Sequence, residues 1–178
     1  MHRKARSNLN IHQFVEVSTT TLFVTKIGDN THMKYHIRLV DATKPKWVAV
    51  LNTLQKRCLP HDVLYVPLIG WWHVVFTDDM EPIAFSGLVP SKRWSDTVYL
   101  CRAGVVPDHR GRGLQKRLIQ VRLKKAKALG MNWAITDTYD NPASTNSLVS
   151  CGFRLFDPTS PWGDRHTLHW RYKITHAL

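Results

Sequence analysis

Arginine and glycine alternate at Arg110, Gly111, Arg112 and Gly113, inside the stretch Val-Val-Pro-Asp-His-Arg-Gly-Arg-Gly-Leu-Gln at residues 105–115. Glycine permits unusual backbone dihedral angles and close approach of a ligand to the chain. An apolar segment precedes this stretch and a helix-periodic segment follows it. The unpaired N–H groups and positive dipole end of a helix would therefore lie beside the glycines. The arrangement favours an anion site suited to a pyrophosphate, although an ordinary strand-to-helix turn is the alternative.

The glycine spacing distinguishes this loop from two better-known phosphate loops. A dinucleotide-binding fingerprint needs a third glycine where the sequence has Lys116, and a P-loop needs a Gly-Lys-Ser or Gly-Lys-Thr sequence, which does not follow here. The loop therefore indicates an anion site of another kind.

The segments around the loop predict a mixed α/β layer with antiparallel and parallel parts. An antiparallel hairpin is expected from the strands predicted at residues 71–77 and 83–89, which a turn at residues 78–82 joins. The predicted strands cover residues 35–40, 71–77, 83–89, 98–106, 132–138, 153–156 and 167–174. The predicted helices are one capped by Asp41 or Thr43 and ended by Pro60, one at residues 114–129 with Gly130 as its C-terminal cap, and one that starts at Asn141 and ends before Gly152.

Composition restricts the class of protein. The 178 residues carry a formal net charge of +12 and three cysteines. The charge indicates attraction to polyanions, or only a basic, well-solvated surface. The odd cysteine count suits a reducing compartment, and there is no apolar run long enough for a membrane span and no secretory signal, so we expect a cytoplasmic protein. Residues 1–33 read as an N-terminal arm or extra hairpin, and residues 34–178 as a single domain.

Two motifs in this order resemble those of the GNAT superfamily of acyl-CoA-dependent N-acyltransferases. Residues 105–114 resemble the acyl-CoA loop of the family, V-x-P-x-x-R-G-x-G. Downstream, Asn141 to Ser144, followed by Leu148 and by Cys151-Gly152-Phe153, is similar to the N-x-x-A/S … G-F segment. The resemblance covers residues 35 to 175, and it implies a partly splayed central sheet flanked by helices.

The resemblance also implies the cofactor and the residues that hold it. Acetyl-CoA would enter between two parallel strands that separate, at residues 98–106 and 132–138. The pantetheine arm would pair with the backbone near Val105 and Val106, and the pyrophosphate would lie on the N–H groups of residues 110–114. The residues that this assigns to the cofactor are Val105, Val106, Arg110, Gly111, Arg112, Gly113, Leu114, Asn141 and Ser144. No metal is expected.

The sequence departs from the family at both familiar proton-transfer positions. Leu148 stands where the family often has the tyrosine that protonates the leaving thiolate. Cys101 and Arg102 stand where it often has an acidic residue, and Gln115 replaces a small residue of the loop. Cofactor binding is therefore better supported than catalysis.

Substitute proton-transfer groups come from the end of the strand predicted at residues 132–138. Asp137 or Asp140 would take the amine proton through a water molecule, and Tyr139 would act as the acid. The alternatives are helix capping or solvation for the aspartates and packing for Tyr139. Cys101 fits inert core better than a nucleophile. Four tryptophans border the acceptor region of this fold and either line an aromatic pocket for the amine or pack in the core: Trp71, Trp72, Trp94 and Trp162.

Three functions fit these observations. The first is an N-acetyltransferase that moves an acetyl group from acetyl-CoA to a primary amine by direct attack in a ternary complex. The second is an acyl-CoA-binding protein without catalysis. The third is a nucleic-acid-binding module that uses the basic helix at residues 114–129. This function is less favoured, because one side of that helix would pack on the sheet.

Overall fold

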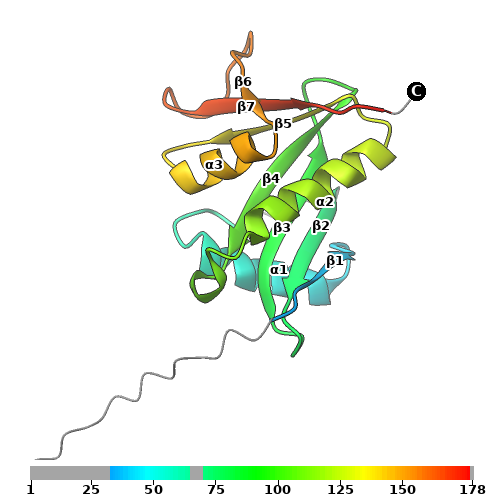
Figure 1. Cartoon of the computed structure of the whole chain (residues 1–178), viewed down its shortest axis with the longest axis vertical. Helices are drawn as coiled ribbons and strands as arrows, with labels where there is room; N and C mark the ends of the chain where they lie inside the picture. The colour runs from blue at the N-terminus through cyan, green and yellow to red at the C-terminus, as the bar shows by residue number, and fades with distance from the viewer. Residues whose placement is uncertain (1–32, 65–69, 177–178) are drawn as a thin grey trace, which may run out of the picture. The chain divides into compact units, whose positions relative to one another are not determined.

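The computed structural model describes residues 33–64 and 70–176, so the predicted N-terminal arm lies, except for Met33, outside the described residues. The elements follow one another along the chain in the predicted order (Figure 1). They are β1 (His36–Val40), α1 (Pro45–Cys58), β2 (Trp71–Phe76), β3 (Pro82–Pro90), β4 (Thr97–Val105), the 3₁₀ turn η1 (Pro107–His109), α2 (Leu114–Ala128), β5 (Trp133–Thr138), α3 (Pro142–Ser150), β6 (Arg154–Leu155) and β7 (Leu168–Lys173).

The strands form one seven-stranded sheet in the order β1-β2-β3-β4-β5-β7-β6. The β4–β5 pair is parallel and the other pairs are antiparallel. This confirms the predicted mixed α/β class and the hairpin, which is formed by β2 and β3.

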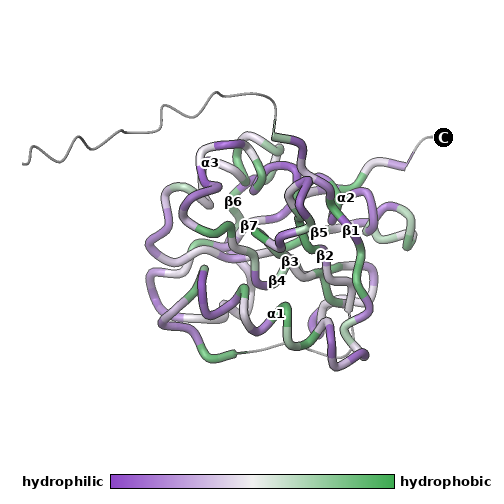
Figure 2. The backbone as a smooth tube through the Cα atoms, turned by 90° about the horizontal axis from the view of Figure 1, so that it is seen from below, coloured by the Kyte–Doolittle hydropathy of each residue, from purple (hydrophilic) through white to green (hydrophobic). Residues whose placement is uncertain are grey.

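Helices cover both faces of the sheet. Successive strand residues point to opposite faces, and β2 shows both sides. Phe76 packs against Trp47 of α1 with ring centroids 6.3 Å apart, and the odd-numbered Trp71 lies under the Lys125 ammonium of α2 at 5.3 Å. Figure 2 shows the same arrangement, with α1 on one side of the strands and α2 and α3 on the other. The sheet is therefore the middle layer of three.

The two parallel strands separate soon after they begin. Only three residue pairs join them, from Thr97 opposite Trp133 to Tyr99 opposite Ile135. Beyond that point the Thr136 hydroxyl still donates to the Leu100 carbonyl at 2.8 Å, while β4 continues along β3 and β5 continues along β7. The expected splay is thus present, and it opens toward the carboxyl ends of both strands.

A β-bulge lies in β4 at the edge of this opening. Ser86 pairs with Ala103 and Gly87 pairs with Cys101, which leaves Arg102 without a partner in the register. Arg102 has φ of +31°, a left-handed conformation that is rare for residues other than glycine. A bulge bends the strand and re-aims its side chains and amides, so the backbone of β4 changes direction where the strands part.

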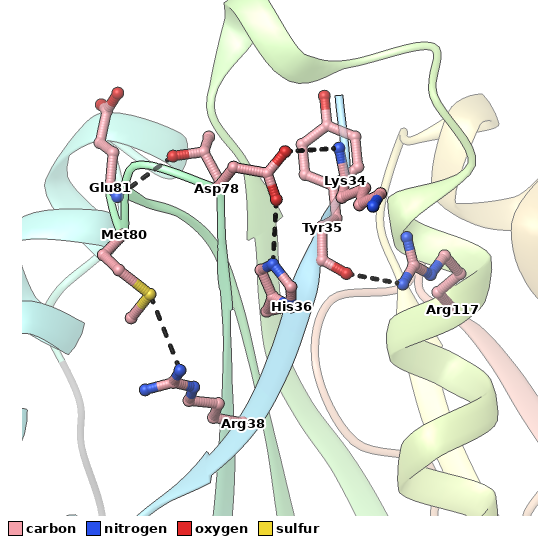
Figure 3. Close-up of polar contacts among 9 residues, drawn as sticks. Lys34, Tyr35, His36, Arg38, Asp78, Met80, Glu81 and Arg117 are labelled. Atoms are coloured by element: carbon pink, nitrogen blue, oxygen red, sulfur yellow. Dashed lines mark hydrogen bonds and ion pairs between the residues drawn. The ribbon is translucent and has the colours of Figure 1, made fainter. Parts of the chain in front are cut away.

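The edge strand β1 is held by polar contacts at its start (Figure 3). Asp78, in the turn after β2, accepts from the Lys34 amide at 3.1 Å and lies 3.0 Å from the His36 ring. The Arg117 guanidinium of α2 donates to the Tyr35 carbonyl at 3.1 Å. The Asp78 contacts hold β1 to the β2–β3 turn, and the Arg117 bond ties the beginning of α2 to the edge of the sheet.

Some local predictions were wrong. α1 begins at Pro45 as expected, but its N-cap is Lys44 and no side chain caps it. The Asp41 carboxylate instead accepts from the amide and hydroxyl of Thr43, at 3.0 and 2.6 Å, in a turn before the helix. The strand predicted at residues 153–156 is only Arg154–Leu155. Gly130, with φ of +72°, does follow the end of α2 as predicted.

Candidate active site

The glycine-rich loop has the backbone that its sequence predicts. Gly111 and Gly113 have φ of +73° and +72°, and an added Cβ at either position would meet no atom within 4 Å. The first turn-closing bond of α2 runs from the Arg117 amide to the Gly113 carbonyl at 3.2 Å. The amides of residues 114–116 therefore precede the first helical hydrogen bond and are free to bind an anion.

The loop arginines have different surroundings. Arg110 is exposed and folds back onto β4, where its Nε donates to the Val105 carbonyl at 3.1 Å. Arg112 is also exposed, with Nη1 4.0 Å from the Met33 sulfur. Neither forms an ion pair with a carboxylate in the described part of the chain, so both charges add to the positive potential of the loop.

A cavity of about 580 Å³ lies beside this loop, and we name it the loop cavity. It brings together seven of the nine residues that the sequence assigned to the cofactor. Val106 is instead buried in the core, and Arg112 is exposed outside the cavity wall. The cofactor candidates that line the loop cavity are Val105, Arg110, Gly111, Gly113, Leu114, Asn141 and Ser144.

The Asn-x-x-Ser segment has a structural role that explains its spacing. The Asn141 side chain is the N-cap of α3 and accepts from the Ser144 amide at 2.9 Å. This bond satisfies one of the unpaired amides at the helix N-terminus. It also places Ser144 on the wall of the loop cavity.

A second cavity, of about 420 Å³, lies where β4 and β5 separate, and we name it the inter-strand cavity. It shares Gln115 and Ser144 with the loop cavity, so the two adjoin at the start of α2. Leu148, at the position of the usual family tyrosine, is buried and lines this cavity. Its other lining residues are Leu59, Asp62, Tyr99, Leu100, Cys101, Arg102, Ala103, Arg122, Thr136 and Asp137.

Asp137 is held in a fixed orientation on the wall of the inter-strand cavity. Its Oδ1 accepts from the Tyr99 hydroxyl at 2.5 Å and from the Trp162 indole N–H at 2.8 Å. Burial, and then the negative charge of Asp137, raise the pKa of Tyr99 well above its usual value. Tyr99 is therefore the proton donor in this pair, and the carboxylate keeps its second oxygen available.

Trp162, which donates to this carboxylate, belongs to an aromatic cluster with Phe156 and His169. The centroid of its ring lies 4.2 Å from that of His169 and 6.4 Å from that of Phe156, and the Arg93 guanidinium lies over the ring at 4.9 Å. Of the four tryptophans weighed from the sequence, Trp162 contacts Asp137, whereas Trp72 is fully buried in the core.

The two other catalytic candidates, Tyr139 and Cys101, differ from Asp137 in their exposure. Tyr139 follows the end of β5, has 58% of its surface exposed, and lines neither of the two cavities. Cys101 lines the inter-strand cavity but is only 5% exposed, and burial raises the pKa of its thiol to about 11. The thiol is thus protonated at neutral pH, which agrees with inert core.

The sequence did not single out Tyr99 or Arg122. It named Trp162 only as a candidate for an aromatic pocket or the core, and not as a partner of Asp137. Tyr99 and Trp162 are far from Asp137 in the sequence, and only the pairing of strands brings them to it. The burial of Arg122 could have been predicted from its spacing. It belongs to the buried side of α2 with Leu118, Ile119 and Ala126, at spacings of three and four residues where apolar side chains are normal.

No helix in the described ranges is long and apolar enough to cross a membrane. Among the same residues, no three His, Cys, Asp or Glu side chains lie together in a way that would hold a metal ion.

Solved structures with the same fold include several acetyltransferases. The ribosomal-protein-S18-alanine N-acetyltransferase from Escherichia coli superposes with a TM-score of 0.63 at 14% identity, over 81% of this chain and 96% of that one. The structure of yncA from Salmonella typhimurium with its cofactor acetyl-CoA gives 0.62 at 15% identity, over 81% and 96%. A Bacillus subtilis acetyltransferase in complex with CoA gives 0.61 at 19%, over 80% and 100%.

No curated protein matches the sequence. The family model described as the acetyltransferase (GNAT) family matches residues 38–153. This range contains the glycine-rich loop, the strands β4 and β5 and the whole of α3. Because this match covers more than half of the chain, the chain belongs to the GNAT family of acetyltransferases.

Proposed function

We propose that the protein is an N-acetyltransferase that transfers the acetyl group of acetyl-CoA to a primary amine by direct attack in a ternary complex. One observation carries the proposal. A glycine loop suited to a pyrophosphate and an oriented carboxylate, Asp137, lie on two cavities that meet at Gln115 and Ser144. A donor bound along the first cavity would present its thioester to an amine beside Asp137, and such positioning is a large part of catalysis.

The loop cavity fits the phosphate end of the donor. The space beside Gly111 and Gly113 is empty where a Cβ would project, so a pyrophosphate can approach the backbone. The amides of residues 114–116 and the charges of Arg110 and Arg112 would then bind it. Acetyl-CoA would supply the activated acyl group, and the bulge at Arg102 interrupts the register of β4, where a backbone amide would polarise the thioester carbonyl.

The proton route starts at Asp137. The amine nitrogen attacks the thioester carbon, and the Asp137 carboxylate takes the proton that the amine loses. When the carbon–sulfur bond breaks, the thiolate takes a proton from the Tyr99 hydroxyl, and the protonated Asp137 carboxyl returns one to Tyr99. The net change moves one proton from the amine to CoA. Tyr139, the acid that the sequence suggested, is the competing donor.

Two measurements test the proposed function. Native mass spectrometry of the purified protein should show bound CoA, and CoA should raise the melting temperature in a concentration-dependent way. Release of CoA thiol from acetyl-CoA, followed with a thiol reagent across a panel of amines, should then identify an acceptor. CoA binding without thiol release would favour the non-catalytic acyl-CoA-binding protein. No CoA binding, together with salt-dependent binding to DNA, would favour the nucleic-acid-binding module.

A further inference from the structure

Arg122 is a buried cation on the wall of the inter-strand cavity. Only 3% of its surface is exposed. Its Nε donates to the Leu118 carbonyl at 3.0 Å, and its Nη1 donates to the Gly87 carbonyl at 3.4 Å. A guanidinium has five N–H donors, so three of them have no partner among the described residues. Burial lowers the pKa of Arg122 to about 10, which leaves it charged at neutral pH.

No acid of the described residues neutralises this cation. Two carboxylates line the same cavity, and neither forms an ion pair with Arg122. Asp62 pairs with Arg102 at 2.8 Å, and Asp137 accepts from Tyr99 and Trp162. Arg122 forms no ion pair within 4.0 Å in the described part of the chain. The charge of Arg122 shifts the pKa values of His73, Cys101 and Cys151, none of which is an acid that is ionised at neutral pH.

An isolated buried charge is costly, and proteins normally pair it or neutralise it. We propose that Arg122 is paired by the substrate: the inter-strand cavity takes an acyl group that ends in a carboxylate, in addition to acetyl, and Arg122 binds that carboxylate. The planar guanidinium fork matches a carboxylate in a two-point contact. This inference rests on the proposed function, because it takes the donor to be a CoA thioester.

The position of Arg122 favours the acyl group over the acceptor as the source of the carboxylate. Arg122 lies on α2, the helix whose first turn borders the loop cavity, seven residues beyond the shared wall residue Gln115 and therefore about 10 Å further along the helix. It bonds to Gly87 directly opposite Cys101, beside the β4 bulge. A thioester that enters past Gln115 would extend its acyl chain toward this point.

The test compares two stable thioether analogues that differ only at the end of the chain, S-(3-carboxypropyl)-CoA and S-butyl-CoA. Binding to the full chain is measured by titration calorimetry. We expect the carboxylate analogue to bind at least about tenfold more tightly than the butyl analogue, the scale of a buried charge-assisted hydrogen bond. Arg122→Met should abolish this preference while CoA itself still binds. Lys124→Gln, which removes one positive charge from the exposed side of the same helix, should retain it.

The outcomes separate this inference from the proposed function. If the wild-type chain binds CoA but shows no preference for the carboxylate analogue, the inference is wrong and the proposed function stands. A preference that survives in Arg122→Met also overturns it. Should Arg122→Met fail to fold, Arg122→Lys, which keeps the charge but not the fork, must weaken the preference. Failure of the wild-type chain to bind CoA at all would overturn the proposed function and this inference together.

Discussion

Asp137 combines a fixed orientation with an available oxygen. Tyr99 and Trp162 both donate to Oδ1, and Oδ2 has no hydrogen-bond partner among the described residues. A base positioned in this way contributes on the order of 10²–10⁴-fold to a proton-transfer step. The carboxylate thus has the geometry of a general base, and the bonds that hold it come from two different parts of the chain.

Asp137→Asn should lower kcat by about 10²-fold or more, because the amide keeps the shape of the side chain but cannot take a proton. The KM for acetyl-CoA should change little, since Asp137 does not line the loop cavity. Steady-state thiol release with an identified acceptor measures both constants. Asp157→Asn, an exposed aspartate in the β6–β7 connection, is the matched control and should turn over normally. Normal turnover in Asp137→Asn would mean that the base lies elsewhere.

Tyr99 and Tyr139 compete for the role of proton donor to the thiolate, and each can be tested by removing only its hydroxyl. Tyr99 contacts Asp137, whereas Tyr139 is exposed and lines neither cavity. We expect Tyr99→Phe to lower kcat by about 10²-fold and Tyr139→Phe to leave it within about twofold. The reverse result, a large loss in Tyr139→Phe with normal Tyr99→Phe, would assign the acid to Tyr139, as the sequence alone suggests.

At the scale of elements, the two ends of α2 have different surroundings. Its first turn borders the loop cavity, and Gly113 precedes that turn in a left-handed conformation. Gly113→Val should lower CoA affinity by at least about tenfold, or about 1.4 kcal/mol. The branched side chain would occupy the space where a pyrophosphate approaches, in a conformation that β-branched residues disfavour. Titration calorimetry on the folded variant measures the change, and unchanged CoA affinity would place the anion site elsewhere.

The far end of α2 should contribute little to CoA binding. Lys124, Lys125 and Lys127 lie at least ten residues beyond Leu114, about 15 Å along the helix, whereas the Debye length at physiological salt is about 8 Å. Replacing all three with glutamine should therefore change the Kd for CoA by less than about twofold. Any non-specific DNA binding should weaken and lose salt dependence. Loss of CoA binding in this variant would show that the anion site extends along the helix.

At the scale of the whole molecule, the sequence predicts contiguous features better than distant pairings. The glycine loop and the order of the elements depend on neighbouring residues, so both were predicted. The insertion of β7 between β5 and β6 was not, because periodicity does not say which strands pair. The Asp137 site depends on such pairings. The short parallel pairing of β4 with β5 brings Tyr99 to Asp137. Trp162 lies in the connection before β7, and the pairing of β7 with β5 brings it there.

Packing between α2 and the sheet buries a histidine that should make the stability of the fold depend on pH. His73 of β2 is 7% exposed, and its Nδ1 has no hydrogen-bond partner in the described ranges. Burial, and then the charges of Arg122 and Lys125, lower the pKa of His73 from 6.5 to about 4. Between these values the unfolded chain binds a proton that the folded chain does not, so stability falls as the pH drops below about 6.5.

The loss attributable to His73 should reach about 2 kcal/mol at pH 5 relative to pH 7. His73→Leu, which cannot take up a proton, should therefore lose about 2 kcal/mol less than the wild-type chain over the same interval. Urea unfolding at both pH values measures the difference, since changes at the other ionisable groups are common to the two proteins. His61→Leu, at an exposed position, should behave like the wild type. Equal losses in His73→Leu and the wild type would mean that His73 takes up its proton in the folded state as readily as in the unfolded one.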